Sequence, residues 1–227
     1  MHSKNMLPKV VIWGAGGHAL VVADILRVRA EYVIVGLLYD GTPGRRGERV
    51  NGFEVLGGRE RLDDLKSQGA THVIFGFGDC TARLQLASSV EAMGLEWATA
   101  VHPRATVAVD ALIGLGTVVA AGAVVNPGAR VGRHCIINTG ATVDHECILG
   151  DAVHVGPGAH LGGRCVVGDA AWIGIGAIVL DRIRIGAGSM IGAGAVITRD
   201  VPEKVVVYGV PGRVVRSVED QAKRNRS

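Results

Sequence analysis

An aliphatic residue recurs every six positions from Val101 to Ile197, in seventeen consecutive instances. A period of six fits neither an α-helix nor a simple alternating strand, but it suits a short strand followed by a turn. We therefore predict a coiled repeat domain in which these side chains point inward. The series is Val101, Val107, Ile113, Val119, Val125, Val131, Ile137, Val143, Leu149, Val155, Leu161, Val167, Ile173, Val179, Ile185, Ile191 and Ile197.

The residues between the aliphatic positions support the same coil. A small side chain lies four residues after nearly every aliphatic residue, and glycine commonly follows that residue directly. A small residue fits a tight corner, and glycine permits backbone angles that are costly for other residues. Three hexads make one triangular coil, and stacking at about 4.8 Å gives roughly five coils. Cys135, Cys147 and Cys165 occupy the small position and are expected to be packing residues.

The first hundred residues show strand and helix patterns in alternation. This alternation predicts a small Rossmann-like parallel α/β domain over residues 1–100, followed by the repeat domain over residues 101–227 with a C-terminal cap. The stretch Gly41–Asn51, rich in glycine and arginine, is expected to be a loop. The other expected elements are a strand at Lys9–Trp13, a helix ending near Arg29, strands at Tyr32–Tyr39 and His72–Phe77, a helix at about Thr81–Met93 and a connecting segment at Leu95–Val101.

Gly14-x-Gly16-x-x-Ala19 follows the first expected strand and opens the first expected helix. Backbone N–H groups at such a turn can bind a pyrophosphate. Asp40, at the end of the second strand, is placed to accept hydrogen bonds from a ribose or a base. This pattern favours a bound nucleotide, with a structural tight turn as the alternative. One hundred residues are short for a complete dinucleotide fold, which argues against a nicotinamide cofactor.

Composition limits the remaining possibilities. Apolar residues make up 48% of the chain and aromatic residues only 4%, which favours a thin, regular core. The formal net charge of +3 is too small to indicate nucleic acid binding. The four cysteines show no CxxC pairing, and neither a signal peptide nor an apolar run of membrane-spanning length is evident. We therefore expect a cytoplasmic protein without a membrane span.

The order of these motifs resembles the sialic acid O-acetyltransferase-like family. Gly-Ala-Gly-Gly-His-Ala at 14–19, Asp40, Gly-Phe-Gly-Asp at 76–79 and the hexapeptide domain carry the resemblance, which spans essentially the whole chain. It implies a left-handed parallel β-helix, as in hexapeptide-repeat acyltransferases, and a nucleotide-linked sugar bound to the small domain. The contacts that it implies are Gly14, Gly16, His18, Asp40 and Gly78, with Asp79 and Arg83 less secure.

The segment Val143–Cys147 supplies candidate acid–base chemistry. Val143 and Cys147 are inward positions of the repeat, so His145 and Glu146 should project outward. The residues alone also allow a plain surface His–Glu pair. The family carries a catalytic histidine followed by an acid here, which implies that His145 is the general base and Glu146 its partner.

The eighteen-residue coil places further candidates around this turn. Gly163 should stack on His145, with its N–H facing the carbonyl of the acyl-CoA thioester from which the acyl group is transferred. Asn138 could contact the acceptor sugar. His154 lies half a coil from His145, so we expect the two to meet only between subunits, in a homotrimer. The family also implies that Gly209 and Pro211 close over the adenine end of CoA, although the same segment could simply cap the last coil.

The family that the chain resembles includes bacterial N-acetyltransferases of nucleotide-linked amino sugars. The resemblance therefore implies an enzyme that transfers an acetyl group from acetyl-CoA to the amine of a 4-amino sugar linked to UDP, GDP or dTDP. The alternatives are O-acetylation of a sialic acid or a similar sugar, and a trimeric scaffold or sensor that binds a sugar nucleotide. No metal is expected, because His134, His154 and His160 differ in phase around the coil.

Overall fold

The computed structural model describes residues 7–41 and 45–220. The chain divides into two compact units, and each is described separately. The first comprises Met1–Gly78 and Gln85–Pro103, and the second comprises Asp79–Leu84 and Arg104–Ser227. Within the described residues, no helix combines the length and the apolar character that crossing a membrane requires.

A four-stranded parallel sheet forms the centre of the first unit, and the sequence predicts a parallel sheet with three of these strands. Its strands are β1 (Lys9–Trp13), β2 (Val33–Leu38), β5 (His72–Phe75) and β6 (Glu96–Trp97), in the order β2-β1-β5-β6. The short strand β7 (Ala100–Val101) follows in the chain. The helices are α1 (Gly17–Arg29), the 3₁₀-helix η1 (Arg59–Arg61), α2 (Leu62–Ser67) and α3 (Cys80–Ala92), of which residues 80–84 are counted in the second unit.

Alternation along β1 divides the core of this unit between the two faces of the sheet. Val11 and Trp13 pack with Phe75 and Trp97 in one cluster, which also contains residues of α2 and α3. Ile12 points to the other face, where Gly76 fits between it and Ala19 of α1. The near-continuous apolar run of β1 is therefore that of a strand covered on both faces.

The prediction of a loop at Gly41–Asn51 is only partly correct. Residues 42–44 lie outside the described residues, but β3 (Arg49–Val50) pairs with β4 (Phe53–Glu54) in an antiparallel hairpin. Asn51 and Gly52 form its turn with φ values of 48° and 85°. Asn-Gly is the usual sequence signal for such a turn, so this hairpin could have been predicted. Neither α2 nor the place of β6 in the sheet was predicted from the sequence.

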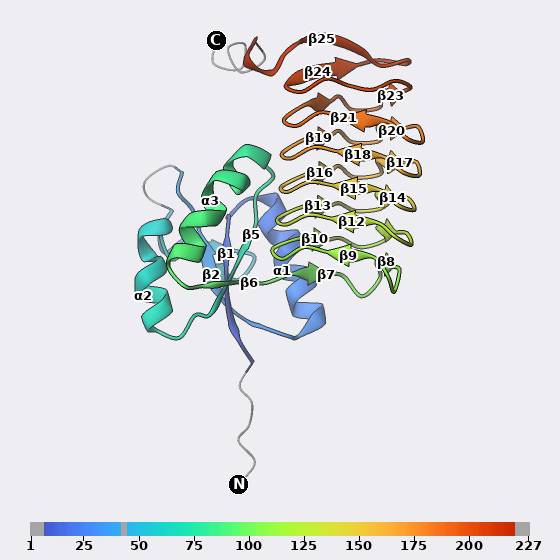
Figure 1. Cartoon of the computed structure of the whole chain (residues 1–227). Helices are drawn as coiled ribbons and strands as arrows, with labels where there is room; N and C mark the ends of the chain where they lie inside the picture. Colours follow the sequence, from blue (N-terminus) through green and yellow to red (C-terminus); the bar gives the residue numbers. More distant parts are fainter. Residues whose placement is uncertain (1–6, 42–44, 221–227) are drawn as a thin grey trace. The chain divides into compact units, whose positions relative to one another are not determined.

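The second unit is a parallel β-helix of two-residue strands (Figure 1). Its first face contains β10 (Val118–Val119), β13 (Ile136–Ile137), β16 (His154–Val155), β19 (Trp172–Ile173) and β22 (Met190–Ile191). The second face contains β8 (Thr106–Val107), β11 (Val124–Val125), β14 (Thr142–Val143), β17 (His160–Leu161), β20 (Ile178–Val179) and β23 (Val196–Ile197). The third face contains β9 (Leu112–Ile113), β12 (Arg130–Val131), β15 (Ile148–Leu149), β18 (Val166–Val167) and β21 (Arg184–Ile185).

Each strand pairs with the strand eighteen residues further along, as Val143 does with Leu161 and Leu161 with Val179. The second residue of each strand is the aliphatic residue of the repeat, and from β10 to β23 it is buried. The second face has six strands, so the solenoid contains one more coil than the five expected.

Polar side chains at the inward corner position bridge neighbouring coils. The thiols of Cys135, Cys147 and Cys165 donate to the carbonyl oxygens of Gly150, Gly162 and Leu180, each at 3.1 Å. All three cysteines are free and buried, and burial raises the pKa of Cys135 to about 12. They are therefore packing residues, as predicted.

The glycines that follow the aliphatic residue have a different role from the one predicted. A side chain on Gly174 would lie 2.6 Å from the carbonyl oxygen of Ile191 in the next coil, and its φ is ordinary. The left-handed conformation instead occurs two residues later, as at Gly176 with a φ of 65°. Non-glycine residues such as Glu146 and Arg164 also adopt it, with φ values of 56° and 60°. The first glycine thus permits close stacking of coils, not an unusual backbone angle.

A hairpin closes the C-terminal end of the solenoid. β24 (Val205–Tyr208) pairs in parallel with β22, and β25 (Arg213–Ser217) pairs antiparallel with β24. This change of direction ends the repeat and covers the last coil, which is the cap that a solenoid needs.

The two glycine positions of one turn allow a test of this account. Gly174→Ala should destabilise the solenoid by about 3 kcal/mol, because its Cβ would press against backbone that cannot move aside. Gly176→Ala should cost about 1 kcal/mol, the strain of a left-handed alanine, since no atom lies within 4 Å of its Cβ. Chemical denaturation followed by circular dichroism compares the variants. Equal losses would contradict the role assigned to Gly174.

Candidate functional site

The turn after β14 carries the histidine and the acid that the sequence singles out. Val143 and Cys147 are fully buried, whereas the side chains of His145 and Glu146 are 48% and 55% exposed. The two therefore project outward as predicted. Nδ1 of His145 lies 3.3 Å from Oε2 of Glu146. A carboxylate at Nδ1 favours the tautomer with its hydrogen on that nitrogen, so Nε2 can accept a proton.

Glu146 has a second partner that was not predicted from the sequence. Nε of Arg164 donates to the same Oε2 at 2.7 Å. The hydrogen bond from Arg164, and after it the one from His145, holds the pKa of the Glu146 carboxyl below its usual range. Arg164 lies eighteen residues after Glu146, so the coil length was the available signal.

Asp144 fixes the backbone of the same turn. Its Oδ1 accepts hydrogen bonds from the N–H of His145 at 2.6 Å and from Nδ2 of Asn126 at 3.0 Å. Asn126 lies eighteen residues before Asp144, one coil earlier. These two side chains hold the start of the turn and were also missed.

Gly163 stacks on His145 as the coil length predicts. A Cβ on Gly163 would lie 2.5 Å from Nε2 of the imidazole, so glycine is needed for the ring to occupy this place. The expected contact of the Gly163 N–H with a thioester carbonyl stays a prediction. That N–H donates to Oδ1 of Asp181 at 3.0 Å, because aspartates in these turns accept N–H groups of the preceding coil.

Asn138 and His154 lie together at another corner of the solenoid. Nδ2 of Asn138 is 3.3 Å from Nε2 of His154, and the Trp172 ring centre is 6.2 Å from that imidazole. His154 belongs to the first face and Asn138 directly follows a strand of that face, whereas His145 follows a strand of the second face. Within one chain, therefore, this pair and the His145 turn occupy different edges, as predicted for His154.

The first unit gathers its predicted residues at the carboxyl edge of its sheet. Gly14, Asp40 and Gly78 follow β1, β2 and β5 respectively. The strand order β2-β1-β5 places a topological switch point between β1 and β5, where open α/β sheets bind ligands. The sequence motif and the fold thus indicate the same edge.

The glycines of this edge have separate structural reasons. Gly14 packs against Gly76, with no room for a side chain between them. Gly16 caps α1 with its backbone, and a side chain there would meet nothing within 4 Å. Packing inside the chain therefore does not require Gly16, and the space beside the helix N-terminus is open. His18 lies on the first turn of the same helix.

Asp40 is engaged by protein groups on both oxygens. Oδ1 accepts the backbone N–H of Arg59 at 2.7 Å, and Oδ2 accepts Nε1 of Trp13 at 3.2 Å and Nε of Arg59 at 2.9 Å. Its carboxylate therefore orients the Arg59 guanidinium, which lies 5.5 Å from the Trp13 ring centre. Arg59 was missed, since nothing in its local sequence marks it.

Asp79 and Arg83 have structural roles inside the second unit. Asp79 caps α3 by accepting the N–H of Ala82 at 2.9 Å. Arg83 is 1% exposed and donates to the carbonyl oxygens of His134 and Ala152, at 3.0 and 2.9 Å. Because the Arg83 guanidinium is buried on these carbonyls, it is not available to a nucleotide, and its suggested contact is wrong.

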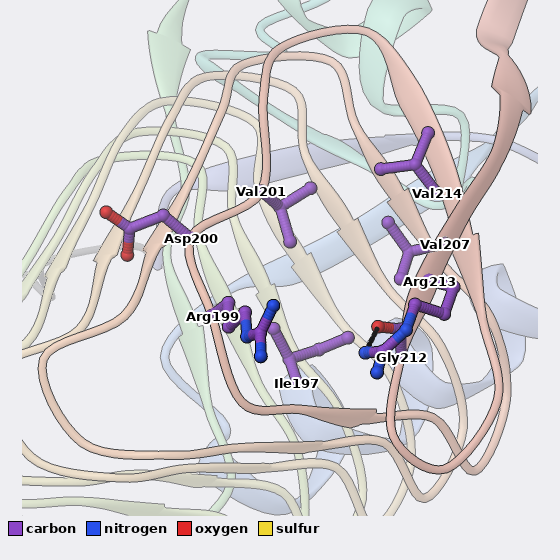
Figure 2. A pocket seen from close by; sticks show the side chains of 8 residues that line it. All are labelled: Ile197, Arg199, Asp200, Val201, Val207, Gly212, Arg213 and Val214. Carbon is purple, nitrogen blue, oxygen red and sulfur yellow. Dashed lines mark hydrogen bonds between the residues drawn. The ribbon is translucent and has the colours of Figure 1, made fainter.

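Gly209 and Pro211 lie exposed in the turn between β24 and β25. Beneath this hairpin is a cavity of about 170 Å³ with an apolar wall that includes Val207. Figure 2 shows Arg199 and Arg213 near Ile197 in this cavity. Nη1 of Arg213 donates to the carbonyl of Gly212 at 3.0 Å.

Within residues 7–41 and 45–220, no three histidine, cysteine or acidic side chains are grouped so that they could hold a metal ion. His160 is instead paired through Nδ1 with the hydroxyl of Thr142 at 2.9 Å.

Two family models match the chain. Residues 9–90 match the PglD N-terminal domain, and residues 164–199 match the bacterial transferase hexapeptide with six repeats. None of the curated protein sequences compared with the chain matches it.

Solved structures match nearly the whole chain. A variant of GDP-perosamine N-acetyltransferase from Caulobacter crescentus, in complex with CoA and GDP-perosamine, is 38% identical with a TM-score of 0.87; the match covers 92% of this chain and 98% of that one. The acetyltransferase domain of PglB from Neisseria gonorrhoeae, in complex with acetyl coenzyme A, is 38% identical with a TM-score of 0.86, covering 92% and 100%. WeeI from Acinetobacter baumannii is 26% identical with a TM-score of 0.82, covering 92% and 100%. Together with the β-helix and the parallel sheet, these matches show that the chain belongs to the hexapeptide-repeat acyltransferase family, with a PglD-type N-terminal domain.

Proposed function

We propose that this protein transfers the acetyl group of acetyl-CoA to the amino group of a nucleotide-linked 4-amino sugar, in the biosynthesis of a bacterial surface glycan. The observation that carries the proposal is the outward His145–Glu146 turn, with Nε2 against Gly163. The likeness to GDP-perosamine N-acetyltransferase over 92% of the chain supports the choice of an amino sugar as acceptor.

His145 acts as the general base in this proposal. Nε2 accepts a proton from the acceptor amine while the amine nitrogen bonds to the thioester carbon. The carbon–sulfur bond then breaks, the CoA thiolate leaves, and the imidazolium returns the proton to it. Glu146, hydrogen-bonded at Nδ1, orients the ring and stabilises its protonated form during this transfer.

The nucleotide end of the acceptor binds at the carboxyl edge of the first unit. The open N-terminus of α1 beside Gly16 suits a pyrophosphate, because its N–H groups and dipole favour negative charge. Asp40 and the Arg59 that it orients are the polar groups available to the ribose or base. Gly14, His18 and Gly78 line the same edge, and Asn138 is proposed to contact the sugar.

Acetyl-CoA extends from His145 toward the C-terminal hairpin. Arg199 follows β23 by two residues, just as His145 follows β14, so it lies three coils away or about 14 Å. The pantetheine arm is as long as four to five extended residues, roughly 15 Å. Its phosphates would reach Arg199 and Arg213 in the cavity of Figure 2, with Gly209 and Pro211 at the adenine end. Gly163 and His154 are proposed to contact the thioester end.

The active form is proposed to be a homotrimer with its sites between subunits. Large apolar side chains are exposed on the solenoid, including Ile148, Trp172 and Ile178. Apolar surface of this kind favours burial against another copy. A neighbour would also bring its Asn138–His154 pair to the His145 turn, which one chain keeps on separate edges. We place the reaction in the cytoplasm, where acetyl-CoA and nucleotide sugars are made.

The first prediction concerns the base. Purified protein should release CoA thiol from acetyl-CoA with a nucleotide-linked amino sugar such as GDP-perosamine, and mass spectrometry should find an amide product. His145→Ala should lower kcat by roughly 10² to 10⁴, the usual contribution of a positioned base. His160→Ala, an exposed histidine outside the turn, should retain activity. If no amino sugar of a panel leads to thiol release, the scaffold alternative is favoured. An ester product would indicate O-acetylation.

The second prediction separates the two ligands. Asp40→Ala should weaken binding of the nucleotide sugar about tenfold and leave acetyl-CoA binding unchanged, because it removes a polar group and releases Arg59. Calorimetry with each ligand measures both affinities, and Asp24→Ala on the exposed side of α1 is the control. Equal losses for both ligands at an unchanged melting temperature would contradict the proposed division.

The third prediction concerns assembly. His145→Ala and His154→Ala chains, each inactive alone, should regain part of the activity when they are denatured together and reassembled. Some clefts of a mixed trimer would then combine both intact histidines. An active monomer in light scattering would refute the intersubunit site, whereas failed complementation in a confirmed trimer would remove His154 from it.

A further inference from the structure

Glu146 Oε2 is shared between two donors, the imidazole of His145 and the guanidinium of Arg164. It lies 3.3 Å from Nδ1 of His145 and 2.7 Å from Nε of Arg164. Glu146 and Arg164 occupy the same left-handed position of adjacent coils, which stacks their side chains. On the opposite side Gly128 has no side chain, and a Cβ there would lie 3.3 Å from Cγ of Glu146. Of the two contacts of Oε2, the one with the Arg164 guanidinium is shorter than the one with the His145 imidazole.

The charge of Glu146 matters because a general base must be neutral before it accepts a proton. A carboxylate beside an imidazole stabilises the imidazolium, so an uncompensated Glu146 would make His145 protonated over a wider pH range. A guanidinium on the same oxygen offsets this effect and adds a repulsive positive charge. Arg164 can thus offset the negative charge of Glu146 without contacting the imidazole.

Two further carboxylates near the turn are bonded to backbone N–H groups. Asp144 accepts the His145 N–H, and Asp181 accepts the N–H of Gly163 on which the imidazole stacks. Glu146 is the carboxylate hydrogen-bonded to the imidazole itself, and Arg164 is the cation bonded to it. The lowered pKa of the Glu146 carboxyl, caused first by Arg164, agrees with this arrangement.

We propose that Arg164 is a positioning residue that acts through Glu146 to keep the His145 imidazole neutral, with Nε2 ready to accept the proton of the acceptor. This inference rests on the proposed function for its catalytic consequence. The charge balance itself follows from the contacts of Glu146.

The test compares Arg164→Gln with Arg182→Gln. Arg182 has the same position one coil further, with a φ of 61°, and is also exposed. Arg164→Gln should move the acidic limb of the pH profile of kcat/KM upward by about 0.5 pH unit, a roughly threefold loss below the limb, with the plateau at high pH retained. Arg164→Lys should restore the limb, and Arg182→Gln should leave it in place. Added salt should reduce the shift, because the pair is exposed.

A second measurement shows whether Arg164 acts through Glu146. In a Glu146→Gln background, Arg164→Gln should shift the limb by much less, since the shared carboxylate is gone. An unmoved limb with a raised KM for acetyl-CoA would overturn the proposal and make Arg164 a ligand contact. Activity lost equally at every pH together with a lower melting temperature would make it a structural residue.

Titration of the His145 ring protons by NMR tests the same charge balance without substrate. The titration midpoint should rise in Arg164→Gln and stay unchanged in Arg182→Gln. If the protein acetylates no amino sugar but this shift is found, the proposed function fails and the charge balance stands. If turnover is normal and the midpoint does not move, the role of Arg164 is wrong.

Discussion

The backbone hydrogen bonds between successive coils are the constraint on which the rest of the solenoid depends. The N–H of Ile148 donates to the carbonyl of Cys165 at 2.9 Å, and the N–H of Arg164 donates to that of His145 at 2.8 Å. Bonds of this kind connect the coils throughout and fix a register of eighteen residues. Each side chain thereby gains neighbours eighteen residues before and after it, about 4.8 Å away.

This register explains why the candidate catalytic side chains lie on the turns. The strands are two residues long, and their inward members fill the core, so few outward positions remain on each face. The turns offer consecutive exposed residues between buried anchors, as His145 and Glu146 lie between Val143 and Cys147. The left-handed residue of each turn aligns with its counterparts in adjacent coils. Glu146 and Arg164 can therefore pair without any other element to position them.

In the first unit, the strand order of the sheet, and not a residue register, determines where the candidate site residues lie. In its parallel sheet all strands end at one edge, and the order β2-β1-β5 opens that edge at a switch point. Asp40 shows how one polar side chain at this edge positions another. Its carboxylate is held by Trp13 and Arg59, so it positions a second polar side chain as well as presenting its own oxygens. Arg83 is the contrasting case, a charged residue that is buried on backbone carbonyls.

The sequence by itself determined the fold class, because a six-residue period suits a coil of short strands and turns, and alternating strands and helices indicate a parallel sheet. It also determined that His145 projects outward and that Gly163 stacks on it, since both follow from counting residues along the coil. The tertiary structure decided which groups bond to which. It assigned the Gly163 N–H to Asp181, buried Arg83, gave Asp40 the partner Arg59, and placed Arg164 on Glu146. These outcomes depend on rotamers and on competition among several acceptors within a few ångströms, which residue order and spacing do not encode.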